Sequence, residues 1–392
     1  MDAIQNFIQR NTTLSAIFAS NLLLSLHYYL IIYVNSSYLS GYFSEDSLSL
    51  LYAGGALINL FLFLFSPRII RKIGVYHFLL LSIVLEGIAI GGLVFADNAL
   101  SAGFFFTIHQ VIVSMILLSF DVFLEAVTND EGHTGKLRSI YLTLANATLV
   151  ISPTIVGLLL IGDNYGPIYT ISALLIVPLL LLVIGTLRDV AVKPPEHVQV
   201  IESLRGMWKH TNIRWVTGAH LILQIFYAWM VIYTPIYLHD HVGFDWNVIG
   251  VLFTIMLLPF VLFEIPVGKL ADERFGEKEF MIFGFIVMAL SLFLFPLVTY
   301  PSFAIWASVL FLTRVGASIV EITSESYFFK QVAGNDSDWI SIFRGTRSVG
   351  YIIGPLCASL CIALFSFHFM FPALALICLT GVICAKNLID TK

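Results

Sequence analysis

A polar stripe runs through the otherwise apolar stretch 302–327. Its members recur every three or four residues and are Arg314, Ser318, Glu321 and Glu325. Helical periodicity places them on one face. If this stretch crosses a membrane, Arg314 lies near its middle, where an arginine raises the insertion free energy by about 2.5–3.5 kcal/mol unless it is paired or hydrated. We therefore expect Arg314 to face a cavity, where it binds an anionic or strongly hydrogen-bonding group or shifts the pKa of a nearby acid. The alternative is a permanent ion pair with Glu321, two turns away.

Shorter polar stripes mark other apolar stretches. The members that share a helical face are Asn21 and Tyr28 in 14–39, Gln110, Ser114 and Asp121 in 102–126, and His220, Gln224 and Tyr227 in 214–238. Amide, hydroxyl and imidazole groups donate or accept hydrogen bonds. The candidate solute contacts are therefore Asn21, Tyr28, Gln110, His220, Gln224 and Tyr227, together with Arg314 and Glu321.

Further acids lie inside apolar stretches. Glu86 is midway along 76–96, and Glu264 is near the end of 247–267. Ionisable groups inside a membrane often relay protons. The proton-coupling candidates are Glu86, Glu264, Glu321 and Asp121. His27 and His109 are expected to form hydrogen bonds between helices, and no metal site or cofactor is predicted.

The composition identifies the environment of these residues. The chain is 58% hydrophobic and 11% charged, whereas soluble domains carry about 25% charged residues. A chain of 392 residues with so little polar surface belongs in a lipid bilayer. Backbone groups must satisfy their own hydrogen bonds there, so an all-α integral membrane protein is predicted.

The apolar stretches are long enough for membrane-spanning helices, which need about 20 residues. Twelve are predicted, at 14–39, 47–65, 76–96, 102–126, 138–161, 166–187, 214–238, 247–267, 279–299, 302–327, 339–364 and 366–386. The first is longer than the apolar part of a secretory signal and has no clear cleavage site. It is expected to stay as a membrane anchor.

Lysine and arginine fix the predicted orientation. If the N-terminus is cytoplasmic, every Lys and Arg except Arg314 lies in a cytoplasmic loop, tail or helix end. Both termini are then cytoplasmic, and the protein is expected in the plasma or inner membrane. Because orientation and lipid headgroups explain these basic residues, no nucleic-acid partner is predicted.

The chain divides into two related halves. The segment 191–213 is predicted to be a cytoplasmic loop with a short amphipathic helix, between bundles at 1–190 and 214–392. A shift of about 202 residues places Gly74 on Gly276 and Pro153 on Pro355. Such agreement at loop glycines and mid-helix prolines is what duplication of a transporter fold predicts.

The loop "GKLADERFGEK" at 268–278 resembles the signature loop of the major facilitator superfamily. The matching residues are Gly268, Leu270, Ala271, Asp272 and Gly276, whereas Glu273 and Arg274 reverse the usual order of charges. With twelve predicted helices and duplicated halves, the resemblance covers the whole chain. It implies two pseudo-symmetric six-helix bundles that rock about a central cavity, which the first, fourth, seventh and tenth helices surround.

The resemblance also implies a latch on the cytoplasmic side. Gly268 would permit close approach of the helices, and Gly276 would permit a backbone turn. Asp272 would supply a carboxylate that faces the start of the fifth helix near Arg138. The N-terminal copy has Ile70 where the acid should be. The substitute ion pairs would join Asp121 and Glu125 to Arg344 and Arg347, and Glu321 and Glu325 to Arg138. The alternative is that these ion pairs only stabilise the fold and have no role in gating.

These patterns predict a monomeric secondary transporter that moves a small solute, with the proton as its coupling ion. The first alternative is a proton-antiporting exporter of drugs or metabolites, and the second is a membrane-embedded enzyme or a non-transporting receptor. The sequence shows no nucleophile elbow and no His-rich metal helix, so no enzyme activity is predicted.

The predicted latch can be tested by cysteine labelling. Asp272→Asn removes the carboxylate charge that would hold the cytoplasmic side closed, so the inward-open population should rise. Labelling of a cysteine placed in the cytoplasmic half of the cavity should then be faster than in the parent protein. Equal labelling rates in the two proteins would count against the latch.

Overall fold

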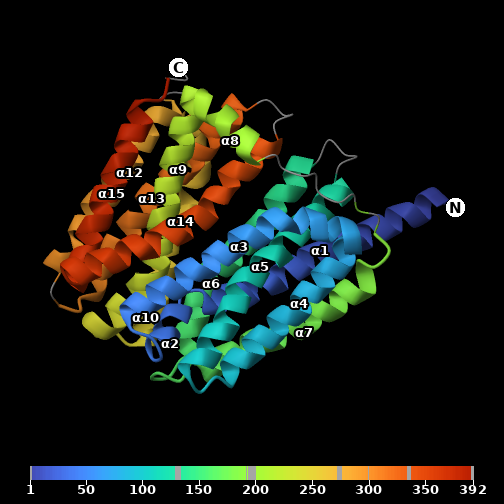
Figure 1. Cartoon of the computed structure of the whole chain (residues 1–392), viewed down its shortest axis with the longest axis horizontal. Coiled ribbons are helices and arrows are strands. Elements are labelled where there is room, and N and C mark those ends of the chain that lie inside the picture. The colour runs from blue at the N-terminus through green and yellow to red at the C-terminus, as the bar shows by residue number, and fades with distance from the viewer. Residues whose placement is uncertain are drawn as a thin grey trace. The chain divides into compact units, whose positions relative to one another are not determined.

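The computed structural model describes residues 2–128, 134–190, 192, 200–271, 276–298, 300–332 and 337–389. All regular elements in these ranges are helices (Figure 1). Twelve of the described helical stretches are long and apolar enough to cross a membrane, which confirms the predicted number and the all-α class. Many large apolar side chains on them are exposed, for example Leu158, Leu181 and Leu290. In a bilayer these side chains face lipid.

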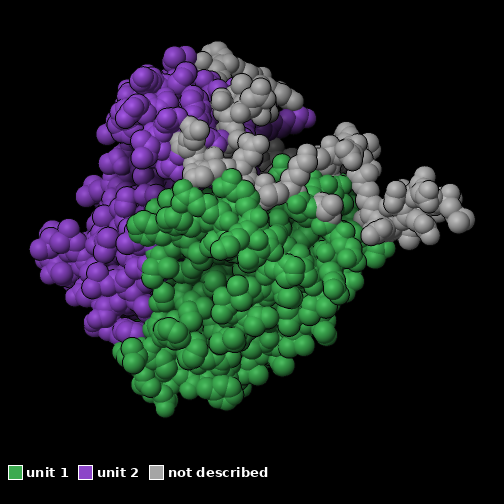
Figure 2. Space-filling model, turned by 45° about the vertical axis from the view of Figure 1, so that its right-hand side comes forward, with its two compact units in different colours: residues 1–42, 58–197 green, residues 43–57, 198–392 purple. Residues whose placement is uncertain are grey.

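The chain forms two compact units, which Figure 2 distinguishes by colour. Unit 1 comprises residues 1–42 and 58–197, and unit 2 comprises residues 43–57 and 198–392. The helices of unit 1 are α1 (Asp2–Ile31), α2 (Asn35–Ser40), the larger part of α3 (Glu45–Ile73), α4 (Val75–Val94), α5 (Ala99–Thr128), α6 (Thr134–Leu159) and α7 (Gly166–Thr186). The helices of unit 2, besides the start of α3, are α8 (Val200–Lys209), α9 (Thr211–Ile236), η1 (Tyr237–His241), α10 (Trp246–Leu262), α11 (Glu264–Leu270), α12 (Glu277–Phe293), η3 (Phe295–Leu297), α13 (Phe303–Gln331), α14 (Ser337–Leu364), η4 (Phe367–Phe369) and α15 (Met370–Lys386).

Two predicted spans are interrupted. The stretch 14–39 ends as a helix at Ile31, because the Val34 amide donates to the Ile31 carbonyl three residues back and tightens the chain into a turn. The short helix α2 follows, and Tyr169 donates to its Asn35 side chain at 2.6 Å. The stretch 247–267 divides at Phe263 into α10 and α11.

Unit 1 packs around an apolar core. In it α4 contacts α5 and α7, while α1 contacts α6 and α7. Residues at helical spacing on α4 supply much of this core, including Phe78, Leu79 and Ile83, and they meet Phe120 and Phe123 of α5. Helices α1, α4, α5, α6 and α7 therefore enclose the centre of unit 1, and any polar group among them is removed from water.

Unit 2 packs around α9, α12 and α13. Helix α9 contacts α14, α15 and α13, and its side chains are buried nearly all round. Helix α12 lies against α13 and α15, as their neighbouring positions in Figure 1 show. A helix buried on every side can carry polar side chains only if those side chains find partners within the protein.

Helix α3 belongs to both units. Its first part bonds within unit 2, where Tyr233 and Ser49 share a hydrogen bond of 2.5 Å and Ser359 donates to Asp46 at 2.7 Å. Its later part bonds within unit 1, where Asn59 donates to Ser114 at 2.8 Å. The boundary at residues 57 and 58 falls inside this one continuous helix of 29 residues.

Two loop glycines adopt the same backbone conformation. Gly74 precedes α4 with φ 84° and ψ 153°, and Gly276 precedes α12 with φ 82° and ψ 158°. Residues other than glycine rarely adopt such backbone angles. The sequence shift that pairs these glycines therefore pairs two positions with the same conformational requirement.

The contact between α12 and α13 depends on two small residues. A methyl group at Gly316 would lie 2.6 Å from the Gly284 carbonyl oxygen and 2.8 Å from the Met288 backbone nitrogen. Backbone atoms cannot move aside without shifting a whole helix. The pair therefore fixes how closely α12 and α13 approach.

We expect Gly316→Ala to destabilise the protein by about 1–3 kcal/mol, because it overpacks this contact. Thermal unfolding of purified protein in detergent measures the change. Gly91→Ala is the matched control, since nothing lies within 4 Å of a methyl group at Gly91 in α4. Alanine there should leave the midpoint unchanged or raise it. Equal midpoints for Gly316→Ala and the parent would show that the helices tolerate separation.

Candidate functional site

Helix α9 carries a chain of internal hydrogen bonds. Thr346 of α14 donates its hydroxyl proton to the Phe343 carbonyl at 2.5 Å, so it accepts from His220 Nδ1 at 2.7 Å. This arrangement leaves His220 Nε2 to accept from the Gln224 amide at 3.3 Å. The imidazole also stacks on the Phe343 ring, with 4.2 Å between centroids. Both nitrogens of His220 are therefore engaged within unit 2.

Arg314 is the least satisfied buried cation in the described part of unit 2. Its side chain is 1% exposed, and its guanidinium lies over the rings of Phe226, at 5.1 Å, and Tyr227, at 5.6 Å. Among the described residues, its Nε and Nη1 have no hydrogen-bond partner. Aromatic faces attract the charge, but they accept the N–H groups poorly.

Glu321 is engaged with a different residue. Tyr227 donates to Glu321 Oε2 at 2.8 Å. Within the described residues, Arg314 forms no ion pair with Glu321, so the permanent pair considered from the sequence is absent. We refer to His220, Gln224, Tyr227, Arg314 and Glu321 as the C-terminal polar cluster. Within this cluster Tyr227 of α9 contacts both Arg314 and Glu321 of α13, whereas His220 and Gln224 bond to each other on α9.

A second cluster lies inside unit 1. Glu86 of α4 accepts at its Oε1 from His27 Nε2 of α1, at 2.9 Å, and from His109 Nδ1 of α5, at 2.5 Å. His27 and Glu86 are 0% exposed and His109 is 2% exposed. Ser172 of α7 faces His27 Nδ1 through its hydroxyl, at 2.8 Å, and its carbonyl, at 3.0 Å. We call His27, Glu86 and His109 the His–Glu–His cluster.

The hydrogen bonds of the two histidines were expected from the sequence, whereas their convergence on Glu86 was not. A signal was available, because His27 and Glu86 both lie near the middle of their apolar stretches. Residues at equal depth on neighbouring spans can meet. Without knowledge of which helices pack together, the sequence could not single out this trio.

The remaining predicted solute contacts of unit 1 occupy separate positions. Asn21 is buried and donates to the Tyr141 carbonyl of α6 at 2.8 Å. Tyr28 is half-buried, and its ring lies 6.3 Å from that of His109. Gln110 is half-buried on α5. Tyr28 therefore adjoins the His–Glu–His cluster, while Asn21 ties α1 to α6.

The predicted proton carriers are also separated. Glu86 is enclosed, Glu321 is bonded to Tyr227, and Asp121 is exposed on α5. Glu264 begins α11, and its side chain lies outside the described residues. Of these acids, Glu86 is the one enclosed by other titratable side chains.

The predicted latch falls partly outside the described residues. Asp272 and Arg274 lie there, as does the Arg138 side chain. A methyl group at Gly268 would meet Ile322 at 3.5 Å, an ordinary contact, so packing against α13 does not by itself require glycine there. The remaining members, which are Glu125, Glu325, Arg344 and Arg347, are exposed. The ion pairs expected between the units stay predictions.

An ion pair beside the latch was not foreseen. Glu277 is 0% exposed at the start of α12, where it pairs with Lys330 and accepts from Ser326 at 3.1 Å. Both partners are on α13. The carboxylate thus ties the start of α12, next to the Gly276 turn, to the end of α13.

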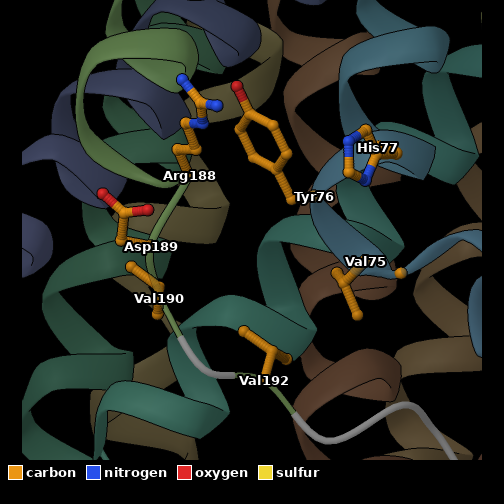
Figure 3. Close-up of a pocket in the computed structure, with 8 residues that line it drawn as sticks. Val75, Tyr76, His77, Arg188, Asp189, Val190 and Val192 are labelled. Atoms are coloured by element: carbon orange, nitrogen blue, oxygen red, sulfur yellow. The ribbon is translucent and has the colours of Figure 1, made fainter.

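A hollow of about 370 Å³ opens on unit 1 near the start of α4. Figure 3 shows Tyr76 and His77 on one side of it and Arg188 and Asp189, from the segment after α7, on the other. None of the predicted pathway residues lines it. The hollow is therefore separate from both polar clusters.

Comparisons with known proteins agree with this architecture. The profile described as Major Facilitator Superfamily matches residues 17–248 and 235–390. A search of curated proteins gives no match. Among solved structures, a mutant of the nucleoside transporter NupG superposes with a TM-score of 0.77 at 11% identity, covering 95% of this chain and 99% of that one.

Two peptide-transporter structures are similar in fold. An auto-inhibited POT family peptide transporter has a TM-score of 0.78 at 10% identity, with 97% of this chain and 98% of that chain covered. The POT family transporter PepTSo has a TM-score of 0.75 at 12% identity, with 95% and 97% covered. At these identities the likeness shows the fold alone. Because the family profile spans nearly the whole chain, the protein belongs to the major facilitator superfamily of transporters.

Proposed function

We propose that this protein is a proton-coupled secondary transporter for a small solute that carries an anionic group. It would work by alternating access, as a monomer in the plasma or inner membrane with both termini in the cytoplasm. The superfamily supports transport of a small molecule across a membrane. The solute class and the coupling ion are inferred from the two polar clusters.

The observation that carries the solute class is the state of Arg314. An N–H group buried without a partner costs about 1–3 kcal/mol, and more when the group is charged. Two such atoms, Nε and Nη1, belong to one guanidinium that is 1% exposed. An arrangement so unfavourable calls for a further partner, and we take this partner to be a group of the solute.

A carboxylate or phosphate fits this guanidinium well. The Nε–H and the terminal nitrogen on the same side of the guanidinium, Nη2, form a fork that two oxygens of an anion accept in parallel, while Nη1 on the other side can donate a separate hydrogen bond. The rings of Phe226 and Tyr227 lie beside the fork. They would exclude water and thereby strengthen the ion pair. A cationic drug would instead be repelled, which disfavours the exporter alternative.

Other predicted contacts would recognise the rest of the solute. Tyr227 and Glu321 form one hydrogen-bonded pair on α9 and α13, next to the guanidinium. His220 and Gln224 would act by positioning α9, since their nitrogens already bond to each other and to Thr346. We propose that Asn21, Tyr28 and Gln110 contribute from the N-terminal half.

Proton coupling is supported by carboxyl groups at membrane depth. A carboxylate at this depth, such as Glu86 or Glu321, is costly unless it has partners or takes up a proton. A site that alternates between these states can tie proton movement to solute movement. The latch residues Asp272, Arg344 and Arg347 would then bias which side of the cavity is open.

We expect Arg314→Ala to weaken solute binding by about 2–3 kcal/mol, roughly 30- to 150-fold, because the charge-assisted hydrogen bonds are lost. The solute is first found by thermal-shift screening of the purified protein against carboxylates, phosphate esters and short peptides. Its affinity and its uptake into proteoliposomes are then compared between variant and parent. Arg314→Lys should retain part of the affinity, because it keeps the charge and loses the fork.

Arg205→Gln is the control, since Arg205 is exposed on α8 and belongs to neither cluster. It should bind and transport the solute as the parent does. If Arg314→Ala inserts normally and binds the same solute with unchanged affinity, Arg314 is not the anion site. Stabilisation by cationic drugs alone would favour the exporter alternative.

A further inference from the structure

The His–Glu–His cluster is isolated from the solvent and from other charged groups of unit 1. Its three residues come from α1, α4 and α5, and the nitrogen and oxygen atoms that face one another lie within 4.8 Å. On α5 the nearest charged side chain is Asp121, twelve residues or about 18 Å from His109 along the helix. The described part of α7 carries no charged side chain.

Three tyrosines are the remaining titratable groups near this level on the described parts of α1, α4, α5 and α7. Tyr28 adjoins His109, with 6.3 Å between ring centroids. Tyr29 lies beside Tyr28, with 5.3 Å between ring centroids. Tyr169 on α7 directs its hydroxyl to Asn35. None of the three carries a charge at neutral pH. The net charge of the cluster is therefore set by its own three side chains.

The hydrogen bonds around His27 suit two protonation states. In one state Ser172 donates its hydroxyl proton to His27 Nδ1, at 2.8 Å, and the imidazole is neutral. In the other state Ser172 donates to the His27 carbonyl, at 3.1 Å, and Nδ1–H donates to the Ser172 carbonyl, at 3.0 Å. In both states Nε2–H donates to Glu86. The heavy atoms accommodate either state without moving.

The net charge of the cluster indicates which of its protonation states is stable when the cluster is enclosed. With two neutral imidazoles the cluster carries the single negative charge of Glu86, and one of its oxygens, Oε2, has no partner among the described residues. One added proton makes the cluster neutral, whether it resides on an imidazole or on the carboxyl group. Enclosure in an apolar bundle penalises net charge strongly, so the closed cluster holds one extra proton.

A metal ion fits the same atoms less well. Tetrahedral zinc, with bonds of about 2.0–2.1 Å, holds its ligand atoms about 3.3 Å apart. The imidazole nitrogens lie 2.5 and 2.9 Å from Glu86 Oε1, which are hydrogen-bond distances. A divalent ion would also leave a net positive charge, because the cluster has one carboxylate. Distance and charge both favour a proton.

We propose that His27, Glu86 and His109 together form a one-proton site that carries the coupling ion of the transporter. This inference rests on the proposed proton-coupled function and names the group that performs the coupling. The proton binds to the trio from water on one side of the membrane and is released to water on the other. Loss of the proton leaves the cluster with a net negative charge among α1, α4, α5 and α7, which favours the admission of water between these helices. Proton binding thereby favours the closed packing of unit 1.

Proton counting on the purified full-length protein tests this site without any solute. Between about pH 5 and pH 9, where imidazoles and perturbed carboxyl groups titrate, the parent protein should release about one proton more than Glu86→Gln. NMR spectra of protein labelled with ¹⁵N-histidine should show the His27 and His109 signals shifting together in one step. His27→Gln and His109→Gln assign the two signals. In Glu86→Gln the shared step should disappear, because no carboxylate stabilises the imidazolium.

Glu279→Gln is the matched control, since it makes the same chemical change at an exposed position at the start of α12. It should release as many protons as the parent. The parent spectra, once assigned with the two histidine variants, do not depend on Glu86→Gln, so misfolding of Glu86→Gln would still leave a readout. If neither histidine signal of the parent shifts over this pH range, the proposal is overturned. Stoichiometric zinc binding that depends on Glu86 would overturn it in favour of a metal site.

These experiments distinguish failure of the proton site from failure of the proposed transport function. A shared proton step in a protein for which no anionic solute is found would uphold the site and remove support for the solute class. Transport of an anionic solute by a parent protein without the proton step would uphold transport and overturn this site.

Discussion

The absence of water in the bilayer core is the constraint on which this structure depends. Backbone groups satisfy it by forming helices, and side chains must satisfy it by meeting one another. In unit 1 the constraint is largely met by the His–Glu–His cluster, in which Glu86, two histidines and Ser172 bond across four helices and only Oε2 of Glu86 lacks a partner among the described residues. In unit 2 it is met for His220 and Glu321 and left unmet for Arg314. The contrast between a closed cluster and an open cation distinguishes the two sites.

The two halves share a scaffold and differ in the chemistry they enclose. Gly74 and Gly276 hold the same backbone turn ahead of corresponding helices. The helices that follow those turns nevertheless differ, since α4 carries Glu86 where α12 carries Met288, and Gly284 one turn earlier on α12 lets α13 approach. Duplication thus preserved the turn, while the buried side chains diverged. In our proposal, one half holds the proton and the other holds most of the anion site.

Much of the fold was predictable from the sequence, because hydropathy and charge act locally. The number of spans followed from apolar length, and the family followed from the loop around Gly268 and Gly276. The interruption after Ile31 was not predictable, since neither proline nor glycine marks it. It depends on α2 bonding to α7 through Asn35 and Tyr169, which is a tertiary contact.

The candidate site was predictable only in part. Periodicity placed Arg314 and Glu321 on one face, and Tyr227 on the helix that meets them. It could not show that Tyr227 rather than Arg314 bonds to Glu321, because that choice depends on how α9 and α13 cross. Convergence of His27 and His109 on Glu86 likewise depends on three helices distant in the sequence. Pair interactions of this kind are set by packing, which a single sequence does not display.

Helix α3 imposes a mechanical condition on the protein. Asp46 and Ser49 are bonded within unit 2 and Asn59 within unit 1, while the helix continues without a break between them. Gly54 and Gly55 stand just before the boundary, where they lower the resistance of the helix to bending. Any rotation of one unit against the other must either bend α3 near Gly54 and Gly55 or break the hydrogen bonds at one of its ends. In the proposed alternating-access mechanism, the stiffness of α3 would therefore limit how far the two units could rotate apart.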